Sequence, residues 1–549
     1  MRFYGSNFFY VMIVLAIFCG CMVTSHSDNY QKLLDNKLFG EELGKAKFLY
    51  GDMGGIYPHT LKTNAFVYKI AILALTTLDS TTNKYKAQSL FTKYGFLLPK
   101  KIWNWETSPL PSYDKPTGLI FGKISGIHPL KGRFFIETAD LGCGSCHGGV
   151  LYGKNGDPTD EFVLGIPNTS INLDEFANNL FEGYKIIIKW DEKIFEKKIL
   201  ALYPQIQKEE LIGMKIIFNG MKKEVKKIID TRGKVSPYKI GGPGMVNGIG
   251  AIKRGLGMLD NSVYHENEVA LVSIPTLGGR SFRSSFLVSG NYTPKKSDFF
   301  YPITEKDTSN KHDQEMAAII SLFTIGTMGY DQKMAANAVP DVKDVMKFIS
   351  KLQTPPFPGE IDTRKAEEGK FVFEKNCQSC HGKYEGTLTR SELVSFPNQL
   401  IPLSIIQTDS FRAIAITKEN FKMLNKIEIG KYFDARVNKG YVAPILLGIW
   451  TTAPYLHNGS VPTLWHLMHP ESRPEKFYLG GHQLDYEKIG IKGETKDGIY
   501  KYSDGYKPWS DYEIYDTSQR GLSNSGHLEP FDKMTEKEKE CLLEFLKTL

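Results

Sequence analysis

Apolar side chains recur at intervals of three and four residues in three segments, which is the spacing of one helix face. The first stripe consists of Val342, Val345, Met346, Ile349 and Leu352. The second, which runs into Cys377, consists of Ala366, Gly369, Val372 and Phe373. The third, at the end of the chain, consists of Cys541, Leu542, Phe545, Leu546 and Leu549, and Thr535 and Glu538 precede it as a capping box. The second stripe predicts a helix that leads into the segment around Cys377, which we call an entry helix. The first and third stripes predict two similar helices that each end a domain, which we call closing helices.

Other stretches lack this period. Residues 124–141 are rich in Gly and aromatic residues, which predicts strand and loop. Residues 354–359, Thr-Pro-Pro-Phe-Pro-Gly, break any helix and predict a linker over 354–362. We therefore expect an N-terminal domain over 21–353 and a C-terminal domain over 363–549. The fold is predicted to be mainly α, with extended irregular insertions in the N-terminal domain.

Composition restricts the class of protein. The 549 residues fit two or three domains, and 41% hydrophobic with 23% charged residues is ordinary for a globular chain. A net charge of +7 is too dilute to indicate a nucleic-acid partner. The densest basic stretch, residues 222–234, has helical spacing and is interpreted as a solvated helix face rather than an anionic docking patch.

The N-terminus has the order of a secretory signal. Arg2 precedes an apolar run over residues 8–18, which is too short for a permanent membrane span. Cys19-Gly20-Cys21 follows, and a small residue directly before a Cys is similar to the cleavage site of bacterial lipoproteins. We expect residues 1–20 to be a signal peptide and Cys21 to be lipidated, with a simple cleaved signal as the alternative. Either reading predicts a periplasmic protein, and lipidation would hold it at the membrane surface.

Two copies of one motif carry the chemistry. They are Cys143-Gly144-Ser145-Cys146-His147 and Cys377-Gln378-Ser379-Cys380-His381. Two thiols that can form thioethers with haem vinyl groups, followed by an imidazole that can bind iron, are typical of c-type haem attachment. A thioredoxin-like redox pair needs no His there, and a zinc site needs a second close ligand pair. The motifs therefore predict two covalently bound haem c groups, with His147 and His381 as proximal iron ligands.

The remaining thiol indicates no disulfide framework. Outside the signal region and the haem motifs only Cys541 is left, so an exported chain has no spare pair to oxidise. Cys541 lies on the apolar face of the last predicted helix. We expect it to be a small buried hydrophobe.

A later segment carries a family resemblance. Residues 448–464, which include Thr452-Ala453-Pro454-Tyr455-Leu456-His457-Asn458-Gly459-Ser460, resemble a segment of the bacterial di-haem cytochrome c peroxidase superfamily. That superfamily also contains the di-haem enzyme that matures methylamine dehydrogenase. Residues 473–481 and 524–527 are more similar to the branch that includes the di-haem rubber oxygenases. The motifs cover residues 366–549, whereas the resemblance over 22–352 rests on the first haem motif and domain order.

The resemblance implies two cytochrome c-like domains whose haems face a common interface. The C-terminal haem would be six-coordinate and pass electrons, and the N-terminal haem would meet peroxide or oxygen. An oxygenase-like distal ligand for the second haem is His527, and Met468 and His457 are the alternatives. His466, His469 and His482 are expected to be ordinary hydrogen-bonded residues.

The first haem has no evident distal ligand. His59, His128, Met245 and Tyr264 remain open as candidates, and Phe323 is expected to pack in the core rather than wall a pocket. The resemblance also implies a Trp between the haems, but Trp190 is the only Trp between Cys143 and Trp450, in an apparently exposed amphipathic segment. An efficient relay between the haems is therefore in doubt, and no acidic general acid-base residue can be singled out.

Three functions follow. The leading hypothesis is an exported di-haem oxidoreductase that takes electrons from a small cytochrome or cupredoxin-like donor and passes them to peroxide or oxygen. The second hypothesis is a non-catalytic electron carrier with both haems six-coordinate. The third is a haem-dependent modifier of a partner protein.

Overall fold

The computed structural model describes residues 23–26, 28–51, 53, 64–78, 87–105 and 115–549. Helices make up 40% and strands 19% of the chain, so the fold is mixed rather than mainly α. The predicted signal peptide and Cys21 lie outside the described residues. Within the described ranges, no helix is both long and apolar enough to cross a membrane.

The N-terminal half is built on one helix crossing. Helix α3 (Gly40–Tyr50) packs against α12 (Gln332–Ile349), which contains the predicted closing stripe except for Leu352, three residues beyond the end of the helix. Gly44 lies at the contact, where a Cβ would come within 2.4 Å of the Asp344 carbonyl oxygen. Phe48 meets Phe348 edge to face, with ring centroids 5.4 Å apart. The absence of a side chain at Gly44 thus lets the two helices approach closely.

The C-terminal half repeats this crossing. The predicted entry helix is α13 (Thr363–Asn376), and the predicted closing helix is α19 (Glu536–Leu546), which has the Thr535 and Glu538 capping box. A Cβ on Gly369 would lie 1.9 Å from the Cys541 carbonyl oxygen. Phe373 packs on Phe545, with the ring centroids 5.1 Å apart. Cys541 is buried, as predicted.

The two entry helices share a sequence signature that the periodicity did not reveal. In α3, Gly44 and Lys45 are followed by Phe48. In α13, Gly369 and Lys370 are followed by Phe373 at the same spacing. Helix α13 leads directly into the second haem motif. Helix α3 is separated from the first motif by several inserted elements, so its role was not recognised from the sequence.

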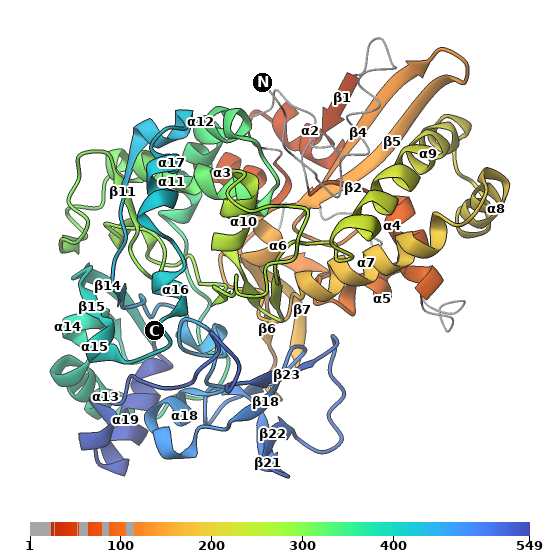
Figure 1. Cartoon of the computed structure of the whole chain (residues 1–549). Coiled ribbons are helices and arrows are strands. Elements are labelled where there is room, and N and C mark those ends of the chain that lie inside the picture. Colours follow the sequence, from red (N-terminus) through yellow and green to blue (C-terminus); the bar gives the residue numbers. More distant parts are fainter. Residues whose placement is uncertain (1–22, 27, 52, 54–63, 79–86, 106–114) are drawn as a thin grey trace.

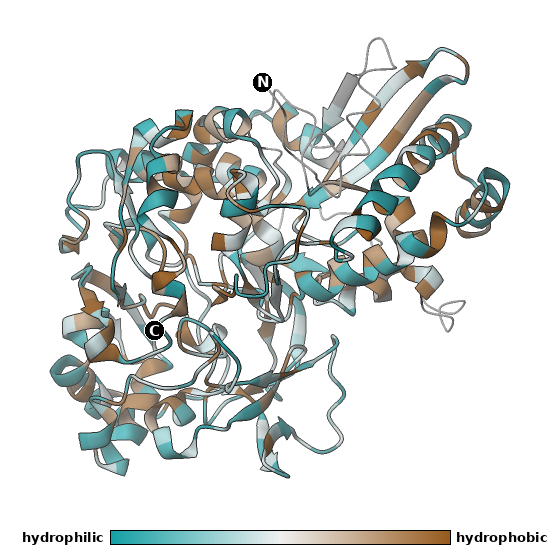
Figure 2. Cartoon of the chain, viewed as in Figure 1, coloured by the Kyte–Doolittle hydropathy of each residue, from teal (hydrophilic) through white to brown (hydrophobic). Residues whose placement is uncertain are grey.

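The insertions form an outer layer in the upper right of Figure 1. The strand prediction for 124–141 is confirmed by the hairpin of β4 (Leu119–His128) and β5 (Gly132–Leu141). Helix α9 (Lys208–Thr231) packs on β5, and Met214, Ile217, Phe218 and Met221 are among its buried residues. In Figure 2 the ribbon of this helix carries both hydrophobic and hydrophilic stretches. The other elements before the first haem motif are β1 (Val23–His26), α2 (Asp28–Asp35), β2 (Phe66–Val67), α4 (Tyr68–Leu78), α5 (Ala87–Thr92) and β3 (Lys101–Ile102).

The remaining elements of the N-terminal half begin with the helix of the first motif. They are α6 (Cys143–Cys146), β6 (Gly148–Tyr152), β7 (Pro158–Leu164), α7 (Leu173–Ile187), α8 (Glu192–Leu202), β8 (Gly241–Gly242), β9 (Met245–Val246), α10 (Gly248–Gly255), β10 (Val272–Ser273), η4 (Arg280–Phe282), β11 (Tyr292–Pro294), β12 (Ile303–Thr304) and α11 (Asn310–Thr327). No helix or strand is assigned over residues 354–362, where the linker is predicted.

The C-terminal half contains short helices and strands between α13 and α19. The first are α14 (Gln378–His381), β13 (Lys383–Thr387), β14 (Arg390–Phe396), β15 (Leu400–Pro402), α15 (Leu403–Ile406), α16 (Phe411–Ile414), α17 (Lys418–Leu424), η5 (Glu428–Tyr432), β16 (Phe433–Ala435) and β17 (Gly440–Val442). The later ones are η6 (Ile449–Thr451), α18 (Leu464–Met468), η7 (Pro470–Ser472), β18 (Lys476–Leu479), β19 (Leu484–Asp485), β20 (Gly490–Ile491), β21 (Gly493–Lys496), β22 (Ile499–Tyr502), β23 (Glu513–Asp516) and η8 (Phe531–Lys533).

Strands from both halves pair with one another. Strand β11 pairs with β16, and β12 joins β14 and β13 in a three-stranded sheet. The two haem motifs are therefore held in one interlocked framework.

Candidate haem-binding sites

The first motif lies on the short helix α6, which follows β5. Cys143 and Cys146 are one helical turn apart, so both thiols project from the same side. The Ser145 hydroxyl donates a hydrogen bond to the Gly118 carbonyl at 2.8 Å and ties the turn to the preceding loop. Burial raises the pKa of the Cys146 thiol to about 12, so this thiol is neutral.

His147 is oriented by a backbone carbonyl. Its Nδ1 donates to the Pro275 oxygen at 3.1 Å, which leaves Nε2 for a metal. Removal from solvent, and then the charge of Arg280, lower the pKa of His147 to about 4. The ring is therefore neutral near pH 7, which is the form that binds iron.

His381 has the same arrangement. It ends α14, and its Nδ1 donates to the Pro444 oxygen at 2.9 Å. Removal from solvent lowers its pKa. The Tyr384 hydroxyl donates to the His381 carbonyl at 3.1 Å and accepts from the Leu446 N–H at 2.8 Å, so it links the motif to the loop that holds Pro444.

The two proline carbonyls belong to a loop that occurs twice. Each proline is followed at the same spacing by a left-handed Gly, a left-handed Leu and another left-handed Gly: Gly279, Leu287 and Gly290 in one copy, and Gly448, Leu456 and Gly459 in the other. A 3-10 helix follows the first Gly in both copies. The bridge between Phe286 and Tyr292 matches the bridge between Tyr455 and Val461. The Pro, Gly, Leu, Gly spacing was the available sequence signal, and it was missed because most of the other loop residues differ between the two copies.

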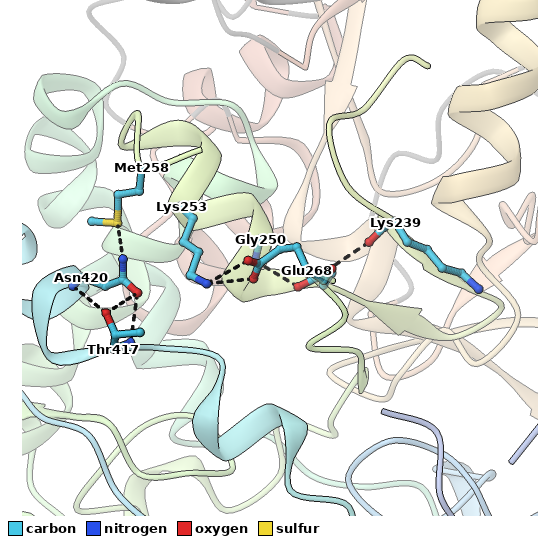
Figure 3. A network of polar contacts seen from close by, with 8 residues as sticks. Lys239, Gly250, Lys253, Met258, Glu268, Thr417 and Asn420 are labelled. Atoms are coloured by element: carbon cyan, nitrogen blue, oxygen red, sulfur yellow. Dashed lines mark hydrogen bonds and ion pairs between the residues drawn. The ribbon is translucent and has the colours of Figure 1, made fainter. Parts of the chain in front are cut away.

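A polar network secures the chain before Pro275 (Figure 3). Asn247 caps α10 and donates to the Glu268 carbonyl at 2.6 Å, and Lys253 pairs with the Glu268 carboxylate at 2.9 Å. The Asn420 amide donates to the sulfur of Met258 at 3.4 Å and links α17 to the segment after α10. These contacts help to fix the position of the loop that orients His147.

His527 faces His381. The ring centroids are 6.1 Å apart with an interplanar angle of 41°. If one metal ion bound a nitrogen of each ring, the two ring centres would lie about 6 Å apart. This distance is the sum of two metal–nitrogen bonds of about 2 Å each and about 1 Å from each nitrogen to its ring centre. Among the described residues, no group is hydrogen-bonded to Nδ1 of His527. The geometry therefore admits one metal ion between the two rings.

The loop that carries His527 is held by Arg473. The guanidinium donates to the carbonyls of Asn524 at 2.7 Å, Gly526 at 2.8 Å and Leu467 at 2.9 Å. The His527 N–H donates to the Ile406 carbonyl at 2.8 Å. His527 has a left-handed backbone, with φ of 50°, so these contacts maintain an uncommon conformation.

The alternative ligands Met468 and His457 have other recorded neighbours. Met468 is buried in the hydrophobic core of the C-terminal half. The His457 ring lies against the Tyr441 ring, with centroids 4.3 Å apart and a tilt of 32°. Burial, followed by the charge of Arg412, lowers the pKa of His457 to about 3. His466, His469 and His482 form hydrogen bonds to Thr463, Glu536 and Tyr152, as expected of ordinary core residues.

The candidates for the first distal position are dispersed. His128 accepts hydrogen bonds within the hairpin turn, Met245 lies beside Gly459, and the Tyr264 ring lies 3.6 Å from Lys234 Nζ. His59 is outside the described residues. Phe323 packs against Phe286 and Tyr292 of the repeated loop, and Trp190 packs in the helical insertion.

Helix α16 carries a buried cation. Arg412 is 3% exposed, and in the described part of the chain no group accepts from its Nε or Nη1. Burial lowers its pKa to about 10, so it stays charged. A buried guanidinium needs an anionic partner, and a carboxylate fits it best. Because a haem carries two propionate carboxylates, the residues present fit this cofactor.

Comparisons with known proteins give a partial match. The profile described as RoxA-like, cytochrome c-like matches residues 440–478, which include the second copy of the loop. Two relatives come from Sinorhizobium fredii (strain NBRC 101917 / NGR234), and both are described as uncharacterized. Protein y4iM is 28% identical over 202 residues, which cover 33% of this chain and 45% of the relative. Protein y4iJ is 28% identical over 219 residues, which cover 31% and 35%.

The chain thus spans less than half the length of these relatives. The profile match lies where the structure places Pro444, η6 and α18, beside the second Cys-His motif. Residues 440–478 are therefore a RoxA-like, cytochrome c-like segment, which indicates a haem protein with a c-type haem.

Proposed function

We propose that the protein is an exported di-haem c-type cytochrome and an oxidoreductase. The second haem, held by His381 and His527, transfers electrons, and the first, held by His147, activates peroxide or oxygen. The observation that carries this proposal is the imidazole pair with centroids 6.1 Å apart. No comparable ring partner of His147 is found among the described residues.

The residues of the chain have separate roles. Cys143 and Cys146, or Cys377 and Cys380, anchor each haem by thioether bonds. Carbonyls of Pro275 and Pro444 hold the proximal imidazoles in the ligating orientation. When bound, haem supplies one-electron redox chemistry, and an open axial position lets it react with a small oxidant.

Spectra of the ferric protein test this proposal. We expect a ligand-binding haem that responds to peroxide or cyanide beside a second haem that does not. A spectrum with only low-spin haem that peroxide, cyanide and carbon monoxide leave unchanged would instead support the electron carrier. Because the repeated proline loop would give both haems the same proximal support, the two functions differ only in whether a protein ligand fills the distal position of the first haem.

The location is part of the proposal. Lipidated Cys21 would hold the protein on the periplasmic side of a membrane, where a small cytochrome or cupredoxin-like donor could reach it. We predict that Cys21→Ala moves the protein from the membrane fraction to the soluble periplasmic fraction. An unchanged distribution in cell fractionation would favour the simple cleaved signal.

A further inference from the structure

A buried tyrosine and a buried histidine form a hydrogen-bonded pair that the two haem sites do not use. The Tyr152 hydroxyl lies 3.2 Å from His482 Nε2, and the two rings stack with centroids 6.0 Å apart. Tyr152 is 7% exposed and His482 is 1% exposed. Tyr152 ends strand β6, which begins directly after His147, and His482 comes from the C-terminal half.

The protonation states of the pair suit proton transfer. Burial raises the pKa of Tyr152 to about 12 although a hydrogen bond with Thr169 opposes the shift, so the phenol keeps its proton. Burial lowers the pKa of His482 to about 4, so the imidazole is neutral. A neutral imidazole protonated on Nδ1 accepts at Nε2, which is the nitrogen beside the phenol. The phenol can therefore lose an electron while its proton moves a short distance to His482.

A second group of tyrosines continues from His482. The Tyr502 and Tyr506 hydroxyls donate to the carbonyls of Gly480 and Gly481, the two residues before His482. The rings of Tyr502 and Tyr506 are 5.5 Å apart. The phenols therefore lie against the backbone that leads directly into His482.

The same group reaches the protein surface. Tyr478 lies 5.5 Å from Tyr502 and stacks on Tyr512, with ring centroids 4.3 Å apart. Tyr512 is 45% exposed. Oxidisable rings thus lie within contact distance of one another from the neighbourhood of His482 to solvent.

The inner end approaches the first haem motif. A strand rises about 3.3 Å per residue, so Tyr152 lies within about 17 Å of His147 along β6. Tyr152 also packs in the same buried cluster as Trp450 and Tyr455 of the repeated loop. Aromatic packing alone would explain the rings, but it does not require a phenol paired with an otherwise unused imidazole.

We propose that Tyr152 and His482 are a proton-coupled redox pair that passes electrons from a phenolic or hydroquinone donor at Tyr512 to the first haem site. This proposal rests on the proposed function, because peroxide is the oxidant. In each transfer Tyr152 gives one electron to the oxidised site and its proton to His482 Nε2. The donor then returns one electron to Tyr152 through Tyr512 and Tyr502. His482 returns the proton, which restores the phenol of Tyr152. Two such transfers and two protons convert one peroxide to two waters.

Freeze-quench electron paramagnetic resonance of the ferric holoprotein mixed with hydrogen peroxide tests the pair. We expect a tyrosyl radical in the wild type and loss of its main component in Tyr152→Phe, which removes only a hydroxyl. His482→Gln should lower the radical yield because Gln cannot take the proton. Tyr500→Phe is the matched control, since Tyr500 is equally buried and its hydroxyl donates to the Ile491 carbonyl at 2.9 Å. Its radical signal should equal that of the wild type.

The outcomes separate the two proposals. If the haem spectrum responds to peroxide but the radical is absent, or persists undiminished in Tyr152→Phe, the redox pair is overturned and the proposed function stands. If the wild-type haem spectrum does not respond to peroxide, both are overturned. Haem absorption of each variant, measured before mixing, shows whether the fold and haem are retained, and His482→Gln decides the result if Tyr152→Phe does not retain them.

Discussion

Two proline carbonyls of the repeated loop orient the imidazoles of His147 and His381. The haem-binding role of the two Cys-His motifs stays a prediction, but the motifs have a local signature, so all six of their side chains could be named in advance. The carbonyls of Pro275 and Pro444 could not, because a backbone oxygen has no signature and each contact joins residues far apart in the chain. His527 was favoured by resemblance, and its ring contact with His381 depends on a loop conformation that no periodicity predicts.

Replacing His527 tests the distal assignment. We predict that His527→Ala converts the second ferric haem from low spin to high spin, because one strong axial ligand is lost. His265→Ala is the control, since His265 is half-buried and bonds to the Asp260 carbonyl at 2.9 Å. Absorption and paramagnetic resonance spectra measure the change, and an unchanged low-spin signal would move the assignment to Met468 or His457.

At the scale of elements, the helical periods identified α12, α13 and α19, and the Gly-rich stretch identified the hairpin. Helix α3 was missed because its apolar pattern is weak and because insertions separate it from Cys143. Its counterpart was found because α13 runs directly into Cys377. In both α3 and α13, a Gly lets the partner helix approach closely and a Phe packs against a Phe of that helix. The two helices therefore share the residues of the crossing rather than a similar hydrophobic pattern.

The close helix crossing can be tested at Gly369. Gly369→Ala places a Cβ 1.9 Å from the Cys541 carbonyl oxygen, so α13 and α19 must separate. We expect the free energy of unfolding to fall by about 1–3 kcal/mol, as for other overpacked cores. The control is Gly248→Ala, where nothing lies within 4 Å of the new Cβ. Thermal denaturation of both holoproteins measures the effect, and equal melting temperatures would contradict the crossing.

At the scale of the whole molecule, two helix crossings, two Cys-His motifs and two proline loops give one plan used twice. The sequence indicated this plan through its motifs and closing helices, while it did not predict that β11 to β14 and β16 would join the halves. The boundaries at 354–362 stay a prediction. The halves differ where function is proposed, since His381 is paired with His527 and the insertions surround the first motif.

The most direct test of unequal sites is a spin count on the ferric holoprotein by electron paramagnetic resonance. We expect one low-spin haem that peroxide and cyanide do not perturb, and one high-spin haem that cyanide converts to low spin. Two low-spin haems in the resting protein, both unaffected by cyanide and peroxide, would overturn the proposed function.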